Sequence, residues 1–82
     1  MTDFDDSARE LIEYIARQLT DEPDLVEVDV FGERNAITVE LRVSPNDMGR
    51  VIGRGGRVAN AMRTLLKAAS QSTRRRINLE IM

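Results

Sequence analysis

The chain has 82 residues, of which 41% are apolar and 32% charged. This length and composition predict one globular domain over residues 1–82. With two Phe, one Tyr and no Trp, its small core is expected to be aliphatic. Cys and His are both absent, which excludes disulfides and removes the commonest general base, metal ligand and nucleophile, so we expect no enzyme, no metal and no cofactor. No apolar run approaches the length of a membrane span and the N-terminus is acidic rather than signal-like, so we expect a cytoplasmic protein without a membrane partner.

The net charge of −2 conceals an uneven distribution along the chain. Residues 1–40 contain twelve acids and three bases, whereas residues 41–82 contain two acids and nine bases. Such asymmetry favours a basic surface that meets a polyanion. Two halves that pair with each other, or a merely solvated surface, would give the same pattern.

An amphipathic helix that ends near Thr20 is predicted at the N-terminus. Ser7 and Glu10 have the spacing of a capping box, and apolar residues then recur at helical spacing. Three acids, Asp3, Asp5 and Asp6, precede this box and suit the positive end of a helix. We interpret these acids as capping and tail residues rather than as metal ligands.

Two segments of alternating apolar and polar residues follow, at 25–31 and 36–43. Residues 32–35 between them include Gly and Asn, so the three segments together predict a β-hairpin. Residues 44–47 (Ser-Pro-Asn-Asp) end the second strand and offer capping oxygens to a following helix.

The C-terminal half predicts two helices and a last strand. Apolar residues have helical spacing on both sides of residues 53–56, first in a helix of barely two turns and then from about Arg57 to Ser70. Residues 77–81 alternate again and predict a third strand. The predicted order is therefore α-β-β-α-α-β, an α+β fold.

The topology of the sheet follows from this order. The hairpin makes the first two strands antiparallel, and a last strand that returns after a two-helix crossover lies parallel to the second strand. We expect a three-stranded mixed sheet with the helices packed on one face and charged residues on the other.

The glycine turn between the two C-terminal helices is the candidate functional site. Gly53 is predicted to end the first helix, and Gly56 to begin the next, whose N–H groups and positive dipole end attract phosphate. Arg50, Arg54 and Arg57 flank this turn with positive charge. A tight turn between helices needs glycine whatever its function, so a purely structural interpretation stays open.

Other phosphate-binding motifs fit less well. A P-loop requires Lys-Ser or Lys-Thr after its last glycine, and a dinucleotide-binding fingerprint requires its glycines directly after a strand. The turn at residues 53–56 follows a helix and lacks the lysine.

The segment VIGRGGRVANAM (51–62) resembles the Ile-Gly-x-x-Gly signature of the KH domain, an RNA-binding module whose GxxG loop clamps a short backbone segment. The element order is similar to the type II KH arrangement, and the chain as a whole resembles the small stand-alone bacterial KH proteins of the KhpA family. The residues that match the signature are Ile52, Gly53, Arg54, Gly55 and Gly56.

The resemblance implies a non-enzymatic protein that binds single-stranded RNA. Arg54 and the N–H groups of the turn would hold phosphates, while Val51, Ile52 and a residue of strand 36–43 would line a groove for bases. The chain departs from the KH pattern at Ala59, where a branched aliphatic residue is usual, which leaves the base preference open.

The resemblance also implies partners and cellular roles. These are a homodimer, or a heterodimer with a larger KH-containing protein of the KhpB (Jag, EloR) type, together with roles as an RNA chaperone or post-transcriptional regulator in cell shape and cell-wall organisation. The residues themselves leave two alternatives: a protein-interaction adaptor in which the glycine turn is only structural, and a helix-turn-helix DNA binder, which the short first helix disfavours.

Other basic residues are ambiguous. Arg74, Arg75 and Arg76 either extend an RNA track or solubilise the loop before the last strand. Arg63 and Lys67, four residues apart, are expected on the solvent face of the last helix.

Overall fold

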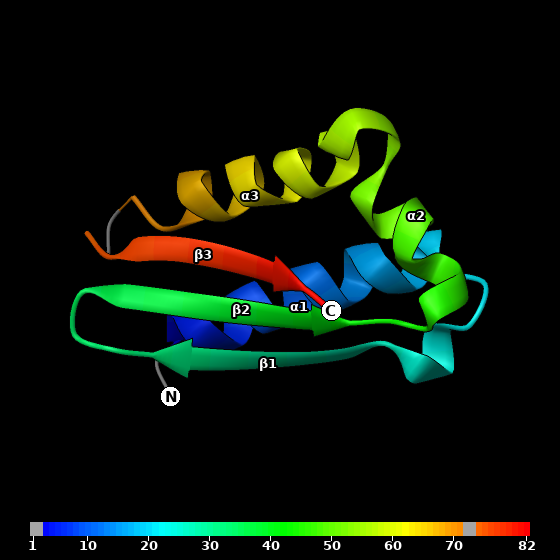
Figure 1. Ribbon diagram of the computed structural model, residues 1–82. Helices are drawn as coiled ribbons and strands as arrows, with labels where there is room; N and C mark the ends of the chain where they lie inside the picture. Colours follow the sequence, from blue (N-terminus) through cyan, green and yellow to red (C-terminus); the bar gives the residue numbers. More distant parts are fainter. Residues whose placement is uncertain (1–2, 72–73) are drawn as a thin grey trace.

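The computed structural model describes residues 3–71 and 74–82. Within them, the secondary structure follows the predicted order α-β-β-α-α-β (Figure 1). The helices are α1 (Asp3–Leu19), α2 (Met48–Ile52) and α3 (Arg57–Ala69), and the strands are β1 (Glu27–Gly32), β2 (Ala36–Arg42) and β3 (Arg76–Ile81). Short 3-10 turns lie before β1 and on both sides of α2. None of the helices in the described residues has the length and apolar character needed to cross a membrane.

The three strands form one mixed sheet in the order β1-β2-β3, as predicted. β1 pairs with β2 antiparallel, and β2 pairs with β3 parallel. Because β2 is central, β1 and β3 form the two edges of the sheet, and α3 runs alongside β3 (Figure 1).

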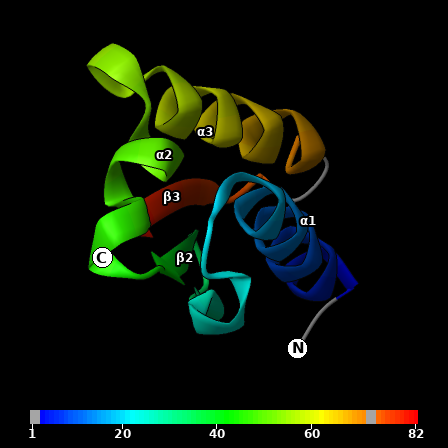
Figure 2. The ribbon, with the colours of Figure 1, turned by 90° about the vertical axis from the view of Figure 1, so that its right-hand side faces the viewer.

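One face of the sheet carries the core. The register places Val28 opposite Leu41 and Val39 opposite Leu79, so the buried residues of the three strands share one face. Helix α1 packs on β1 and β2, and α3 packs on β3 (Figures 1 and 2). The buried apolar residues are Ala8, Ile12, Ala16, Val26, Val28, Ile37, Val39, Leu41, Val51, Ala59, Met62, Leu66 and Leu79.

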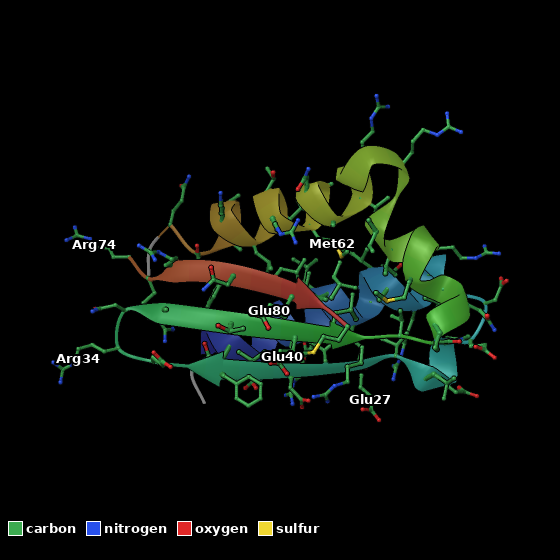
Figure 3. The ribbon with its side chains drawn as sticks, in the orientation of Figure 1. Glu27, Arg34, Glu40, Met62, Arg74 and Glu80 are labelled. Atoms are coloured by element: carbon green, nitrogen blue, oxygen red, sulfur yellow. The ribbon has the colours of Figure 1, made fainter. Side chains whose placement is uncertain are left out.

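The opposite face of the sheet carries polar residues and a row of acids. Asp29 lies opposite Glu40, and Glu40 lies opposite Glu80, so three carboxylates cross the three strands in one line, here called the acid row. Glu40 and Glu80 lie together on this face (Figure 3). Arg42 pairs with Asp29 at 3.0 Å and with Glu40 at 3.5 Å. This face is therefore negative, and the repulsion between like charges on neighbouring strands destabilises the sheet locally.

The start of α1 differs from the predicted one. The helix begins at Asp3, so Ser7 lies inside it and the capping-box prediction is wrong. Two contacts with the rest of the fold stabilise the first turn of the helix. Phe4 packs against the core, and the buried carboxylate of Asp5 lies 3.4 Å from the Arg75 guanidinium. Tertiary contacts of this kind override a local capping signal.

The segment between β2 and α2 also differs in detail. Ser44 caps the 3-10 turn at Pro45–Asp47, because its side chain accepts a hydrogen bond from the Asn46 N–H. Asp47 makes no side-chain cap on α2. Its buried carboxylate instead accepts hydrogen bonds from the backbone N–H groups of Asp21 and Glu22, at 3.0 and 3.1 Å. Asp47 thus ties the connection after α1 to the start of α2.

Candidate nucleic-acid interface

The turn at residues 53–56 joins α2 to α3 through three glycines in left-handed backbone conformations. Their φ angles are +77° at Gly53, +63° at Gly55 and +80° at Gly56. The Gly53 N–H donates to the Gly49 carbonyl at 2.9 Å and so closes α2, and the Gly56 N–H donates to the Gly53 carbonyl at 3.1 Å. Since L side chains rarely adopt these φ values, glycine meets a backbone requirement at each of the three positions.

Gly53 has a second requirement, which comes from packing. A Cβ atom at Gly53 would lie 2.5 Å from Val58 Cγ2 and 2.8 Å from the Val58 backbone nitrogen. A Cβ at Gly55 would meet nothing within 4 Å. The surface of the turn at Gly55 is therefore open for another molecule to approach the backbone.

The N-terminus of α3 opens onto this turn without a side-chain cap. Gly56 is the N-cap residue and provides no acceptor, and in this described stretch the first turn of α3 contains no acidic residue. The first N–H groups of a helix lack partners within it and carry a partial positive charge. The Arg57 N–H donates to the Arg54 carbonyl within the turn. The turn therefore combines a helix N-terminus that has no side-chain cap with glycine backbone, a combination that favours an anion.

Arg54 and Arg57 add formal charge to this end of the molecule. Both side chains are exposed, and neither takes part in an ion pair with any residue in the described ranges 3–71 and 74–82. Their guanidinium groups are therefore available to an external anion.

Arg50 is engaged elsewhere. Its guanidinium donates to the Asp21 carboxylate at 2.8 Å and lies 3.5 Å from the Asp47 carboxylate. Arg50 thus differs from Arg54 and Arg57 in having acidic partners, which partly neutralise it. The Asp21 contact has no local signal in the sequence, because Asp21 lies 29 residues away, whereas Asp47 lies only three residues before Arg50.

The two apolar candidates also differ in position. Val51 is fully buried and belongs to the core. Ile52 is 36% exposed at the end of α2, so its side chain can meet a ligand beside the turn. Ala59, the position that departs from the KH pattern, is buried in α3 at 3% exposure, whereas Val58 is half-buried against Gly53.

A hollow of about 410 Å³ lies between α3 and β3. Arg63 and Lys67 line it from the helix, and residues 77–80 line it from the strand. Strand β2 does not line this hollow, so the expectation that a residue of strand 36–43 lines the groove for bases stays a prediction that the hollow does not support. β2 is the central strand, and its apolar residues Ile37, Val39 and Leu41 are completely buried under the helices.

The edge of β3 turns backbone groups toward this hollow. The Met82 N–H donates to the Leu41 carbonyl, and the Met82 carbonyl accepts from the Val43 N–H, so Met82 faces β2. Because alternate residues of a strand direct their N–H and C=O groups to opposite sides, Ile77, Leu79 and Ile81 direct theirs to the free edge.

Arg63 reaches this edge from α3. Its guanidinium donates to the Leu79 carbonyl at 3.3 Å and to Asn60 Oδ1 at 3.0 Å. Arg63 therefore lies at the wall of the groove rather than on a simple solvent face. The spacing of Asn60, Arg63 and Lys67 along one side of the helix is the sequence signal that could have shown this polar strip.

The three consecutive arginines before β3 have different environments. Arg75 is largely buried beside Asp5, and its side chain is 18% exposed. Arg74 and Arg76 are exposed, and the Arg76 N–H donates to the Asn35 carbonyl at the hairpin. Arg75 thus holds the fold together, a role that sequence analysis missed because its partner lies 70 residues away.

The mixed sheet, the helix order and the GxxG turn between two helices define a KH domain of type II. The sequence model of the family described as "KhpA/KhpB, KH domain" matches residues 9–81 of this chain. The chain belongs to this family.

Curated relatives resemble nearly the full chain. The RNA-binding protein KhpA of Caldanaerobacter subterraneus subsp. tengcongensis is 49% identical over 72 residues, which cover 88% of this chain and 96% of the relative. The proteins of the same name from Borreliella burgdorferi and Clostridium perfringens are 48% and 49% identical; the matches cover 89% of this chain in both cases, and 89% and 97% of those relatives. No solved structure matches the chain.

Proposed function

We propose that the protein is a non-enzymatic module that binds single-stranded RNA and holds its sugar–phosphate backbone at residues 53–56. The observation that carries this proposal is the turn itself, with its glycine backbone, a helix N-terminus without a side-chain cap, and Arg54 and Arg57, which have no ion-pair partner among residues 3–71 and 74–82. The curated relatives, which are named RNA-binding proteins, support it.

The bound strand runs from this turn into the groove between α3 and β3. Phosphates contact the N–H groups of the turn and the guanidinium groups of Arg54 and Arg57, while Ile52 provides an apolar contact beside them. Arg50 and Val51 are left out of the contact set because they have structural partners. With one Tyr and two Phe in the chain, bases cannot stack on a run of aromatic rings, so they meet aliphatic side chains and the backbone edge of β3.

Binding by one copy is expected to be modest, which suits an RNA chaperone or post-transcriptional regulator that acts together with a second domain. We propose that the second domain is another copy of this chain or a larger KH protein, since the family description names KhpB beside KhpA. Linking two sites raises the effective affinity without new contacts. Exposed apolar side chains such as Leu65 (48%) and Tyr14 (66%) favour such protein contacts.

The test is the double substitution Arg54→Asp/Gly55→Asp, measured by fluorescence anisotropy with a labelled single-stranded RNA. We expect RNA binding to be abolished because two carboxylates replace the phosphate-binding charge and crowd the open backbone. The fold is expected to survive, because a Cβ at Gly55 meets nothing within 4 Å and Asp is among the residues that tolerate left-handed backbone.

The matched control is Arg34→Asp/Asn35→Asp, which changes the net charge by the same amount in the hairpin between β1 and β2, at the far end of the sheet from the turn (Figure 3). It is expected to retain most of the RNA affinity. Circular dichroism and thermal melting check that both variants are folded. If the turn variant is folded and still binds RNA as the control does, the glycine turn is only structural and the adaptor function is favoured.

A further inference from the structure

A further inference starts from the Leu79 carbonyl at the edge of β3, because this acceptor already has a hydrogen-bond donor. Leu79 directs both its N–H and its C=O to the free edge, beside the hollow that residues 77–80 line. The C=O accepts a hydrogen bond from Arg63 at 3.3 Å. The groove wall at this point therefore offers the Leu79 N–H and the Arg63 guanidinium, which are both donors.

Arg63 is held in place rather than free. Asn60, one helical turn earlier, accepts from the same guanidinium at 3.0 Å, so the group is supported from both walls of the groove. A guanidinium has five N–H donors in a planar fork, and these two bonds use two of them. The remaining donors are available to a ligand in the groove, together with the ammonium group of Lys67, which lines the same hollow.

The donor pattern discriminates among bases. A free N–H and C=O pair on a strand edge suits a base that presents an acceptor beside an amino group, as adenine does with N1 and N6 and cytosine with N3 and N4. Arg63 removes the acceptor from that pair. A groove wall that offers only donors suits a base with two adjacent acceptors. Guanine has such a pair in O6 and N7, and an arginine guanidinium can donate one hydrogen bond to each of them. In single-stranded RNA this edge is exposed.

We propose that Arg63 is a specificity-determining residue that makes the groove between α3 and β3 select guanine at the nucleotide that reaches Leu79. This inference rests on the proposed function, because it requires RNA to enter the groove from the glycine turn. It assigns phosphate binding to residues 53–57 and base choice to a different residue, Arg63.

The experiment compares short uridine oligonucleotides that carry one central guanine, adenine or 7-deazaguanine. The wild-type protein is expected to bind the guanine oligonucleotide at least about fivefold more tightly than the adenine one, the lower end of the discrimination given by one bidentate base contact. The 7-deazaguanine oligonucleotide, which lacks the N7 acceptor, is expected to lose most of this preference.

Two substitutions remove one positive charge each from the same groove. Arg63→Met is expected to bring the guanine-to-adenine affinity ratio close to one, because it frees the Leu79 carbonyl and deletes the fork. Lys67→Met is the control and is expected to weaken all oligonucleotides alike while the ratio is kept. A ratio is insensitive to a general loss of folded protein, which thermal melting also checks.

The inference is overturned if the wild type shows no guanine preference, or if Arg63→Met keeps it. Failure of the proposed function is a distinct result: no oligonucleotide binds, or binding persists in the folded Arg54→Asp/Gly55→Asp variant. Binding that depends on the turn but ignores the central base supports the proposed function and overturns this inference alone.

Discussion

The four glycines at positions 49, 53, 55 and 56 serve different purposes, although the sequence shows them as one cluster. Gly53 is required by its φ of +77° and by Val58, whose atoms fill the space of a Cβ. Gly55 is required by its φ alone. Gly49 lies inside α2, and a Cβ there would meet nothing within 4 Å. Gly49 therefore has no local requirement for glycine.

This difference predicts opposite effects of one chemical change. Gly53→Ala is expected to destabilise the fold by about 2 kcal/mol or more, because the new methyl group collides with Val58 and the backbone strain adds to it. Gly49→Ala is expected to stabilise the fold by up to about 1 kcal/mol, since alanine is the better residue inside a helix. Urea unfolding of the two variants beside the wild type measures both effects. Equal stabilities of the two variants would contradict this account of the turn.

At the level of single residues, the sequence predicted the turn better than it predicted the arginines around it. The positive φ angles at residues 53, 55 and 56 could be expected, because these glycines lie between two segments with helical spacing of apolar residues. The engagement of Arg50 by Asp21 does not follow, because the fold brings this carboxylate close from 29 residues away. Arginines that lie together in the sequence therefore differ in how far their charge is neutralised.

At the level of elements, Asp47 is the junction on which the position of the turn depends. Its carboxylate, 1% exposed, accepts two backbone hydrogen bonds from the segment after α1 and lies 3.5 Å from the Arg50 guanidinium. These contacts tie the connection between α1 and β1 to the short helix α2 that leads into the turn. A helix of five residues cannot be stable by itself, so it relies on such contacts.

We predict that Asp47→Ala lowers the free energy of unfolding by about 2–3 kcal/mol, because two backbone N–H groups lose their acceptor. The adjacent substitution Asn46→Ala is the control. Its side chain is exposed and its effect is expected to stay within about 0.5 kcal/mol. Chemical denaturation of both variants provides the measurement, and a cost for Asp47→Ala no larger than that for Asn46→Ala would show that the junction carries little stability.

Elements that form from local sequence patterns were predicted correctly, whereas features fixed by contacts between distant residues were not. Alternation in residues 25–31 and 36–43 predicted the hairpin, and the two-helix crossover predicted the parallel pairing of β3. The start of α1 was wrong, because its first turn is fixed by Phe4 in the core and by the Asp5–Arg75 pair. The hollow beside α3 lies at β3 and not at strand 36–43, because periodicity shows which face of a strand is apolar and not which strand borders a helix.

At the level of the whole molecule, the charge asymmetry of the chain has two outcomes. Part of it is internal: three arginines of the second half pair with acids of the first half, in the pairs Arg42–Asp29, Arg50–Asp21 and Arg75–Asp5. Elsewhere, Arg54 and Arg57 lie at the glycine turn, and the acid row lies on the exposed face of the sheet. Pairing between the two halves, one of the interpretations that the sequence allowed, is therefore present, while a basic surface that meets a polyanion stays a prediction.

This division predicts different responses to salt. RNA affinity is expected to fall about sevenfold between 50 and 200 mM NaCl, because each phosphate neutralised on a single strand releases counterions and two cations, Arg54 and Arg57, contact phosphates. The midpoint of thermal unfolding is expected not to fall over the same range, because salt also screens the repulsion within the acid row. Anisotropy titrations and melting curves at the two salt concentrations test this, and an affinity that does not change with salt would refute a phosphate clamp.

The acid row has one more consequence, which concerns the approach of RNA before any contact forms. A molecule with a negative sheet face and positive charge at the glycine turn behaves as an electric dipole in the field of a nucleic acid. That field exerts a torque, which favours orientations that bring the turn closer to the nucleic acid than the acid row. Orientation is thereby selected during the encounter, and fewer collisions are wasted than for an evenly charged domain of the same size.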